Sequence, residues 1–152
     1  MMYSDIVNDF VFRTKKNLEA IEVDLSHGKE VYEVTHLINS LLGLIILPEQ
    51  KFYDNLPETL TLEDLKQEGW PESLLNWDHA LGKNFKNLMR LLRNGISHFH
   101  LEFLVELGEL SGLKIWNINN SNIKDWEVEL SIEDLKSLVE KFIEKIKELK
   151  LI

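Results

Sequence analysis

The 152-residue sequence predicts a mainly α-helical fold, a helical bundle with a small antiparallel three-stranded sheet inserted before the C-terminal helix. Over most of the chain, apolar residues recur with the period of about 3.6 residues that is typical of helices. Between residues 99 and 130 the pattern changes to the alternation of strands. Helical periodicity then returns after the capping sequence Ser131-Ile-Glu-Asp134. We expect one domain over residues 1–152, because this length suffices for a real hydrophobic core.

Two helices are predicted in the first third of the chain. The first spans about residues 4–25, with Ser4 as its N-cap, and it ends at Ser26-His27-Gly28. The second spans about residues 29–47, because Pro48 stops it. Its later half is apolar on nearly every side, so we expect it to be the central buried helix.

The middle of the chain leads into a long amphipathic helix. Residues 48–77 are less regular, with a capped short helix predicted at Thr61-Leu-Glu-Asp-Leu65. The amphipathic helix is predicted to start between Pro71 and Asp78 and to continue to His98. On a wheel of about 100° per residue, its apolar stripe consists of Leu81, Phe85, Leu88, Leu92, Ile96 and Phe99.

Three short strands and a closing helix are predicted after His98. Apolar and polar residues alternate over residues 99–107, as in a half-buried strand, and again over residues 113–117 and 126–130. The capping box at Ser131 then opens the last helix. Its apolar stripe consists of Leu135, Leu138, Val139, Phe142, Ile146 and Leu149.

Composition excludes several classes of function. The absence of cysteine excludes a disulfide framework, thiolate zinc sites and thiol catalysis. The longest apolar run, Leu44–Leu47, is far shorter than the ~20 residues that span a bilayer. The N-terminus has no basic segment typical of a secretory signal, so we expect a cytoplasmic protein without membrane association. No Gly-rich phosphate loop, HExxH or EF-hand pattern is present, and we expect no cofactor.

The predicted amphipathic helix carries a basic face within an acidic chain. The formal net charge of the protein is −9, yet no acidic residue occurs from His79 to Leu101. The polar face of this stretch consists of Lys83, Lys86, Arg90, Arg93, Asn94, Ser97 and His98. Such a local basic face indicates anion binding, whereas the overall negative charge disfavours indiscriminate binding of nucleic acid.

The end of this helix carries groups suited to cleaving RNA. Asn94 lies four residues before His98 and shares a face with it, whereas Arg93 and His98 are about 140° apart on an ideal helix. A second copy of the helix could bring the set together across a symmetry axis. An imidazole can shuttle protons, which is worth roughly 10²–10⁴ in rate, and a guanidinium can stabilise charge on a phosphoryl oxygen. This pairing suits RNA, whose 2′-OH is an internal nucleophile.

Simpler interpretations remain open for the same residues. Arg93 can serve only to cap or salt-bridge the helix end, and His98 can be a structural residue at a helix-to-strand junction. Lys83 and Lys86 can belong to a solvated surface. A metal site formed by His98, His100 and Glu102 is a further alternative, which the spacing supports only weakly.

The segment Leu91-Leu-Arg-Asn-Gly-Ile-Ser-His98 is similar to the Arg-Asn-x-x-x-His signature of the HEPN superfamily, and the order of elements resembles a plasmid- and mobile-element-associated branch. The resemblance implies a HEPN-like helical bundle that forms a homodimer through the motif helix. It also implies a metal-independent endoribonuclease with Arg93 and His98 from both subunits as catalytic groups. Asn94 would then orient His98 or contact the scissile phosphate.

The basic face of the helix supplies candidate RNA contacts, and the resemblance suggests partners. We predict that the RNA contacts are made by Arg90, Lys86, Lys83 and Ser97, and that His100 supports His98. Many proteins of this superfamily act in toxin–antitoxin or antiviral systems. Some of these toxins carry Tyr two residues after the motif His, where a nucleotidyltransferase modifies it, whereas this chain has His100. The alternative function is a non-catalytic module of the same fold that binds RNA, a nucleotide, an antitoxin or a nucleotidyltransferase.

Overall fold

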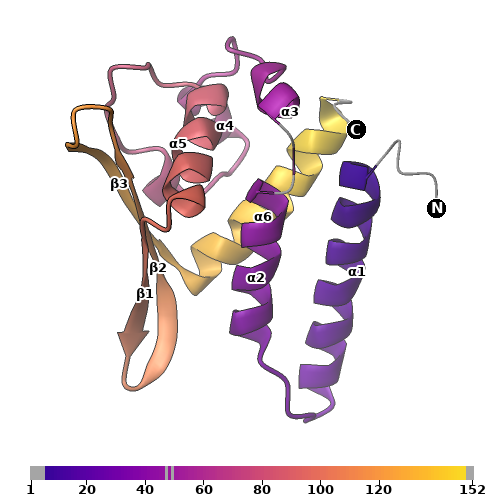
Figure 1. Ribbon diagram of the computed structural model, residues 1–152. Coiled ribbons are helices and arrows are strands. Elements are labelled where there is room, and N and C mark those ends of the chain that lie inside the picture. Colours follow the sequence, from indigo (N-terminus) through magenta and orange to yellow (C-terminus); the bar gives the residue numbers. More distant parts are fainter. Residues whose placement is uncertain (1–5, 47, 49, 150–152) are drawn as a thin grey trace.

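The computed structural model describes residues 6–46, 48 and 50–149, so the predicted N-cap Ser4 lies outside the described residues (Figure 1). In chain order the elements are α1 (Ile6–Ser26), α2 (Glu33–Ile46), α3 (Gln50–Asp54), α4 (Leu62–Gln67), a 3₁₀ turn (Glu72–Leu74), α5 (Phe85–Ser97), β1 (Leu101–Glu106), β2 (Glu109–Ile118), β3 (Lys124–Ser131) and α6 (Ile132–Glu148). The predicted fold class is therefore confirmed. Among the described helices, none has the length and apolar character needed to cross a membrane.

Helices α1 and α2 form a hairpin that lies beside α6 (Figure 1). A Cβ at Gly43 would lie 2.7 Å from the ring of Phe10, so the backbone of α2 closely approaches α1. The predicted start of the second helix at Lys29 is wrong, because α2 begins at Glu33. The Lys29 amide instead donates to the Asp24 carbonyl at 3.1 Å and its ammonium pairs with the Asp24 carboxylate at 2.7 Å, which ties this residue to the end of α1.

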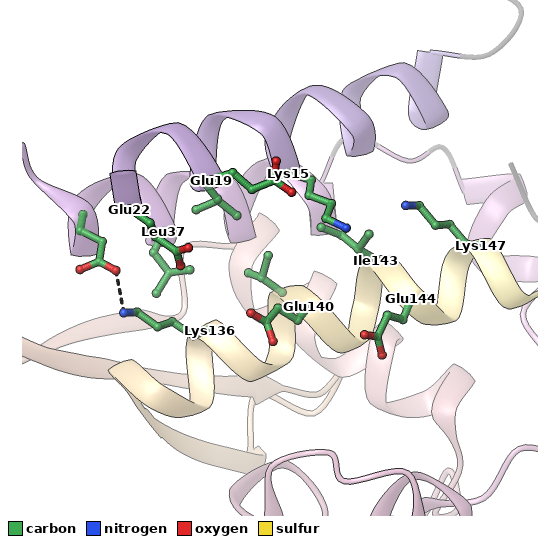
Figure 2. Close-up of a pocket in the computed structure, with 12 residues that line it drawn as sticks. Lys15, Glu19, Glu22, Leu37, Lys136, Glu140, Ile143, Glu144 and Lys147 are labelled. Carbon is green, nitrogen blue, oxygen red and sulfur yellow. Dashed lines mark hydrogen bonds and ion pairs between the residues drawn. The ribbon is translucent and has the colours of Figure 1, made fainter. Parts of the chain in front are cut away.

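A groove of about 260 Å³ lies between α1 and α6, where α2 also contributes to its wall (Figure 2). Its apolar lining consists of Leu18, Leu37, Val139 and Ile143. Its charged lining consists of Lys15, Lys136 and Lys147 with Glu19, Glu22, Glu33, Glu140 and Glu144. Because carboxylates outnumber ammonium groups here, the groove is electrostatically unsuited to a polyanion such as RNA.

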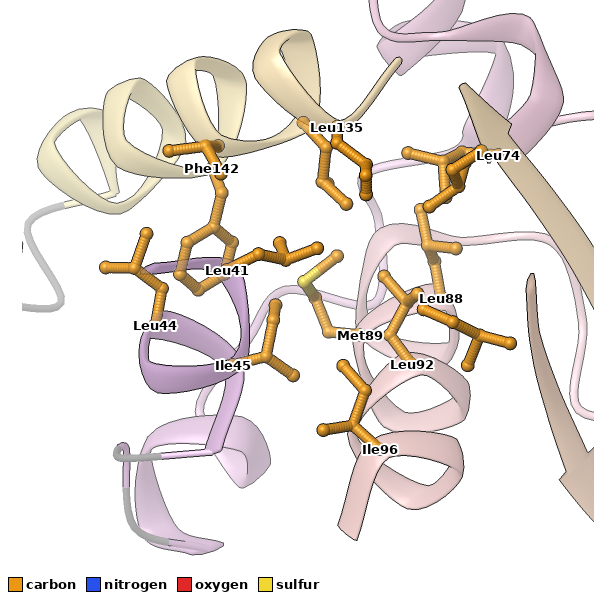
Figure 3. Close-up of a cluster of buried hydrophobic side chains, with 14 of the residues drawn as sticks. Leu41, Leu44, Ile45, Leu74, Leu88, Met89, Leu92, Ile96, Leu135 and Phe142 are labelled. Atoms are coloured by element: carbon orange, nitrogen blue, oxygen red, sulfur yellow. The ribbon is translucent and has the colours of Figure 1, made fainter. Parts of the chain in front are cut away.

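The hydrophobic core lies where α2, α5 and α6 meet (Figure 3). Leu41, Met89 and Phe142, one from each helix, are almost completely buried. Burying a side chain of this size stabilises the fold by about 1.5–3 kcal/mol. The core therefore fixes the apolar side of α5 and leaves its opposite side facing solvent.

The three strands form an antiparallel sheet in the order β1-β2-β3. Leu113 and Ile115 of β2 pair with Leu130 and Val128 of β3, and these four side chains are buried beneath the helices. On the opposite face, the Lys114 ammonium lies 3.5 Å from the carboxylates of both Glu127 and Glu129. The sheet thus has one face in the core and one face covered by polar groups.

The first strand is more exposed than its alternating pattern predicts. Phe103 and Val105 are 46% and 60% exposed, and Leu107 in the following turn is fully exposed. The tip of the β1–β2 hairpin stands clear of the helices (Figure 1). The prediction of a half-buried strand over residues 99–107 is therefore wrong for this tip. Alternation of apolar and polar residues distinguishes the two faces of a strand, but it does not show whether another element covers the apolar face.

The motif helix is shorter than its periodicity predicts. Helix α5 begins at Phe85, and the Asn84 side chain caps it by accepting from the Asn87 amide at 2.9 Å. Leu81 is 44% exposed in the preceding loop, so the predicted start between Pro71 and Asp78 is wrong. The loop is instead held by backbone and side-chain hydrogen bonds, among them one from the Asn87 amide group to the Gly82 carbonyl at 3.2 Å.

Candidate functional site

Helix α5 presents the predicted motif residues on the side opposite the core. Arg90, Asn94, Ser97 and His98 are exposed, and Arg93 is half-buried. Leu88, Leu92 and Ile96 on the other side are buried, which confirms the central part of the predicted apolar stripe. The sequence pattern thus correctly separates the two faces of this helix between residues 85 and 97.

Arg93 is positioned by an aromatic ring that the sequence analysis did not identify. Its guanidinium carbon lies 4.6 Å from the centroid of the Tyr53 ring, which comes from α3. Burial raises the pKa of the Tyr53 phenol well above its ordinary value, against a smaller lowering by the Arg93 charge, so the hydroxyl stays protonated. It donates a hydrogen bond to the Ile45 carbonyl. The ring is therefore fixed, and it offers Arg93 a cation–π contact.

Arg93 belongs to a small cationic pocket of about 40 Å³. Its lining consists of Tyr53, Asp54, Lys86, Arg90, Arg93 and Asn94. Three cationic side chains and one amide thus meet a single carboxylate, an arrangement that favours an anion. The Lys86 ammonium already donates to the Asp54 carbonyl and to the Glu58 carboxylate, both at 3.0 Å. Lys86 is therefore already engaged at one side of the pocket.

His98 lies at the C-terminal end of α5, one turn after Asn94. Its backbone amide donates to the Asn94 carbonyl at 3.1 Å, and its side chain is exposed. His98 does not line the cationic pocket, whereas Asn94 does. Asn94 therefore lies between the pocket and the imidazole along the helix.

The ring of His98 is the first in a row of stacked rings. Its centroid lies 5.8 Å from that of His100, with 29° between the planes, and His100 lies 6.0 Å from Trp116 at 16°. The Lys124 ammonium lies 5.3 Å from the Trp116 centroid. This arrangement fits the predicted role of His100 as a support for His98. It also adds Trp116, which the sequence analysis had not placed at the site.

Gly95, in the middle of the motif, sets the position of α5 on the sheet. A Cβ at this position would lie 2.6 Å from Ile115 Cγ2 and 2.7 Å from the Trp116 carbonyl oxygen. The His100 amide donates to the Gly95 carbonyl at 2.7 Å, and the Trp116 amide donates to the His100 carbonyl at 3.1 Å. The end of the motif helix is therefore seated directly on β2.

Lys83 is separated from the other predicted RNA contacts. It precedes the N-cap of α5, so its predicted place on the helical face is wrong. It lines a different pocket, together with Lys66 and Glu72, and its ammonium lies 3.6 Å from the Asp78 carboxylate. Ser97 is exposed on α5 but does not line the cationic pocket.

A half-buried histidine–aspartate pair lies elsewhere, and both ring nitrogens of its histidine are occupied. His79 Nε2 lies 2.7 Å from the Asp125 carboxylate, and His79 Nδ1 accepts from the Leu81 amide at 3.0 Å. Asn117 also donates to Asp125 at 2.7 Å. Burial alone would raise the pKa of Asp125, but the hydrogen bonds from Asn117 and His79 hold it below its ordinary value. This cluster therefore ties the 78–82 loop to the sheet and leaves no ring nitrogen open to a substrate.

The metal alternative receives no support from the described residues, in which no group of three or more His, Cys, Asp or Glu side chains is placed to hold an ion. This applies to His98, His100 and Glu102 as to the others. Glu102 pairs with Lys114 in the register of β1 and β2, on an exposed part of the hairpin.

Comparisons with known proteins identify the family. Neither curated proteins nor solved structures gave a match. The model of one protein family, HEPN pEK499 p136, matches residues 1–150. This match covers the motif helix, the sheet and the closing helix together, and it confirms the resemblance to the HEPN superfamily. The chain belongs to the HEPN pEK499 p136 family.

Proposed function

We propose that this protein is a metal-independent endoribonuclease that acts as a homodimer through its motif helices. The observation that carries the proposal is the cationic pocket around Arg90 and Arg93, with the exposed imidazole of His98 one turn beyond Asn94. The pocket offers a place for a phosphate, and the imidazole offers a proton acceptor beside it. These are the two groups that cleavage by the ribose 2′-OH requires.

In this mechanism, neutral His98 accepts the proton of the 2′-OH, and the 2′ oxygen attacks the adjacent phosphorus. The bond from phosphorus to the 5′ oxygen breaks, which leaves a 2′,3′-cyclic phosphate on one fragment. The departing oxygen takes a proton from an imidazolium and becomes a 5′-OH. Arg93 stabilises the negative charge that builds on the phosphoryl oxygens, and Asn94 contacts the phosphate or orients the imidazole.

The proposed dimer supplies a second exposed imidazole, which a single copy lacks at the motif. One protomer offers one exposed imidazole at the motif, because His100 is half-buried and stacked between His98 and Trp116, whereas the reaction needs a base and an acid at the same phosphate. A two-fold axis next to the end of α5 would bring His98 of one protomer near the cationic pocket of the other. Cellular settings that fit this activity are toxin–antitoxin and phage-defence systems, with an antitoxin or a nucleotidyltransferase as partner.

The proposal is tested with single-stranded RNA in the presence of EDTA. The wild-type protein is expected to cut the RNA and to leave 2′,3′-cyclic phosphate ends. His98→Ala and Arg93→Ala are expected to lower the rate by roughly 10²–10⁴ while the Tm stays close to that of the wild type.

His27→Ala is the matched control, because His27 is exposed at the end of α1, where it plays no part in the proposed site. This variant is expected to cut RNA at the wild-type rate. Cutting that survives in His98→Ala, or that disappears with EDTA, would refute the proposed roles.

The second candidate function is a non-catalytic module that binds RNA or a protein partner. Its protein-partner form is favoured by the Glu58 carboxylate on Lys86, which reduces the positive potential at one side of the pocket and so weakens its attraction for RNA. A wild-type protein that binds RNA without cutting it under any of these conditions would support this candidate.

A further inference from the structure

Phe99 follows the motif histidine in a backbone conformation that a bulky residue rarely adopts. Its φ is +59°, in the left-handed region. The Phe99 amide donates to the Ile96 carbonyl at 3.0 Å, and the His100 amide donates to the Gly95 carbonyl at 2.7 Å. This is the Schellman ending of a helix, in which glycine is the usual residue at the left-handed position. Backbone geometry therefore favours glycine where this chain has phenylalanine.

The Phe99 side chain does not compensate for this by packing. It is 78% exposed and is not part of the hydrophobic core. The preceding residues on the surface, Asn94, Ser97 and His98, are polar and exposed. The ring is thus an isolated apolar group directly beside the proposed catalytic imidazole.

We propose that Phe99 is a stacking platform for the nucleobase next to the scissile phosphate. This inference rests on the proposed ribonuclease function and names a substrate contact that it needs. Proteins recognise single-stranded RNA by stacking unpaired bases on aromatic rings beside cationic groups that hold the backbone. Phe99 supplies the ring just after the end of α5, and Arg90 and Arg93 of that helix supply the cations. Any base has a face to stack, so the contact adds affinity with little sequence preference.

A base fits this ring better than a second protomer does. The cores of protein–protein interfaces are contiguous, well-packed apolar surfaces, whereas Phe99 stands among polar side chains. A base needs only one exposed ring face and neighbouring polar groups, which is what this surface offers.

The test compares Phe99→Gly with Leu107→Gly. Leu107 is the matched control, because it has a φ of +51° and is fully exposed, but it lies in the hairpin turn at the far end of β1. Both changes relieve the same kind of backbone strain and remove an exposed apolar side chain. Both are therefore expected to raise the Tm by roughly 2–4 °C.

Only Phe99→Gly is expected to weaken RNA binding. The probe is a single-stranded RNA that carries 2′-O-methyl groups and cannot be cut, with its affinity measured by fluorescence anisotropy. Loss of one stacked base is expected to raise the Kd roughly 5- to 100-fold, whereas Leu107→Gly keeps the wild-type Kd. Phe99→Trp is expected to keep wild-type affinity, because it retains an aromatic face.

The outcomes separate this inference from the proposed function. An unchanged Kd in Phe99→Gly would overturn it. The inference would also be overturned if light scattering showed Phe99→Gly to be a monomer and the loss of the dimer accounted for the higher Kd. Phe99 would then be a contact between copies. A wild-type protein whose binding depends on Phe99 but that never cuts RNA would refute the ribonuclease proposal and leave the stacking contact intact.

Discussion

The two proposed catalytic side chains are held in very different ways. Arg93 is half-buried on the face of Tyr53, which is itself fixed by its hydrogen bond to the Ile45 carbonyl. His98 is exposed, and its ring stacks on that of His100. The guanidinium is thus preorganised by the core, whereas the imidazole remains accessible to substrate.

Variants at Tyr53 separate the role of its ring from the role of its hydroxyl. Tyr53→Phe keeps the surface beneath Arg93 but removes the hydrogen bond to the buried Ile45 carbonyl, so the free energy of unfolding is expected to fall by about 1–2 kcal/mol. Its cleavage rate is expected to stay near that of the wild type.

Tyr53→Leu removes the aromatic face as well. The cleavage rate is expected to fall roughly tenfold, equivalent to about 1.4 kcal/mol, because Arg93 loses its cation–π contact. Denaturant unfolding and steady-state cleavage check the two variants together. Equal rates in Tyr53→Phe and Tyr53→Leu would show that the ring does not position Arg93.

At the scale of elements, the site depends on how closely α5 approaches β2. Gly95 is the point of contact, and the motif histidine follows three residues later at the end of the helix. The next backbone segment, His100, is bonded both to α5 and to β2. Any displacement of α5 from the sheet would therefore move His98 and its stacked partners.

Gly95→Ala is expected to lower the free energy of unfolding by about 1–3 kcal/mol, because the added methyl group meets the Trp116 backbone. This cost exceeds the gain of at most about 1 kcal/mol in helix propensity. Cleavage is expected to fall as well, since the end of α5 must shift.

Gly43→Ala is the matched control within another helix. Its Cβ would meet the Phe10 ring at 2.7 Å, a similar distance, but that neighbour is the end of a side chain that can move. Chemical denaturation is expected to show a smaller loss for Gly43→Ala, with cleavage unchanged. A larger loss for Gly43→Ala would contradict this account of the α5–β2 contact.

At the scale of the whole molecule, a cationic pocket lies within a chain of net charge −9. Long-range electrostatics therefore repel RNA from most of the surface and leave the pocket as a local exception. The proposed dimer would place two such pockets and two His98 side chains on either side of one axis.

Mixed dimers test this arrangement. Wild-type protein and His98→Ala are unfolded together in equal amounts and refolded as a mixture, so that about half of the dimers contain one of each chain and about a quarter are wild type. Because the proposed site needs an imidazole from each protomer, the mixed dimers are expected to be nearly inactive, and the mixture is expected to keep about a quarter of the rate of the same amount of wild-type protein. A mixture that keeps about half of that rate would show that each site lies within one protomer.

Local patterns in the sequence determined the fold class, the polar face of the motif helix and the capping box that opens α6. The period of apolar residues and the capping of helices depend on residues only a few positions apart. Both can therefore be predicted from the sequence itself. The cap at Ser131 formed as predicted, because its hydroxyl accepts from the Asp134 amide at 3.1 Å while the Asp134 carboxylate accepts from the Ser131 amide.

Which distant residues meet at the site, and which apolar residues stay exposed, depends on how the elements pack together and could not be predicted from local patterns. Tyr53 lies 40 residues before Arg93, and Trp116 comes from a different strand, so no local period connects them with the motif. Leu81 and Phe99 extend the apolar period of α5 but lie outside the helix, because loop hydrogen bonds and a left-handed residue end it. The period of the sequence pattern indicates which side chains share a face of an element. Whether that face is buried, and which residues it contacts, depends on the packing of elements that are far apart in the chain.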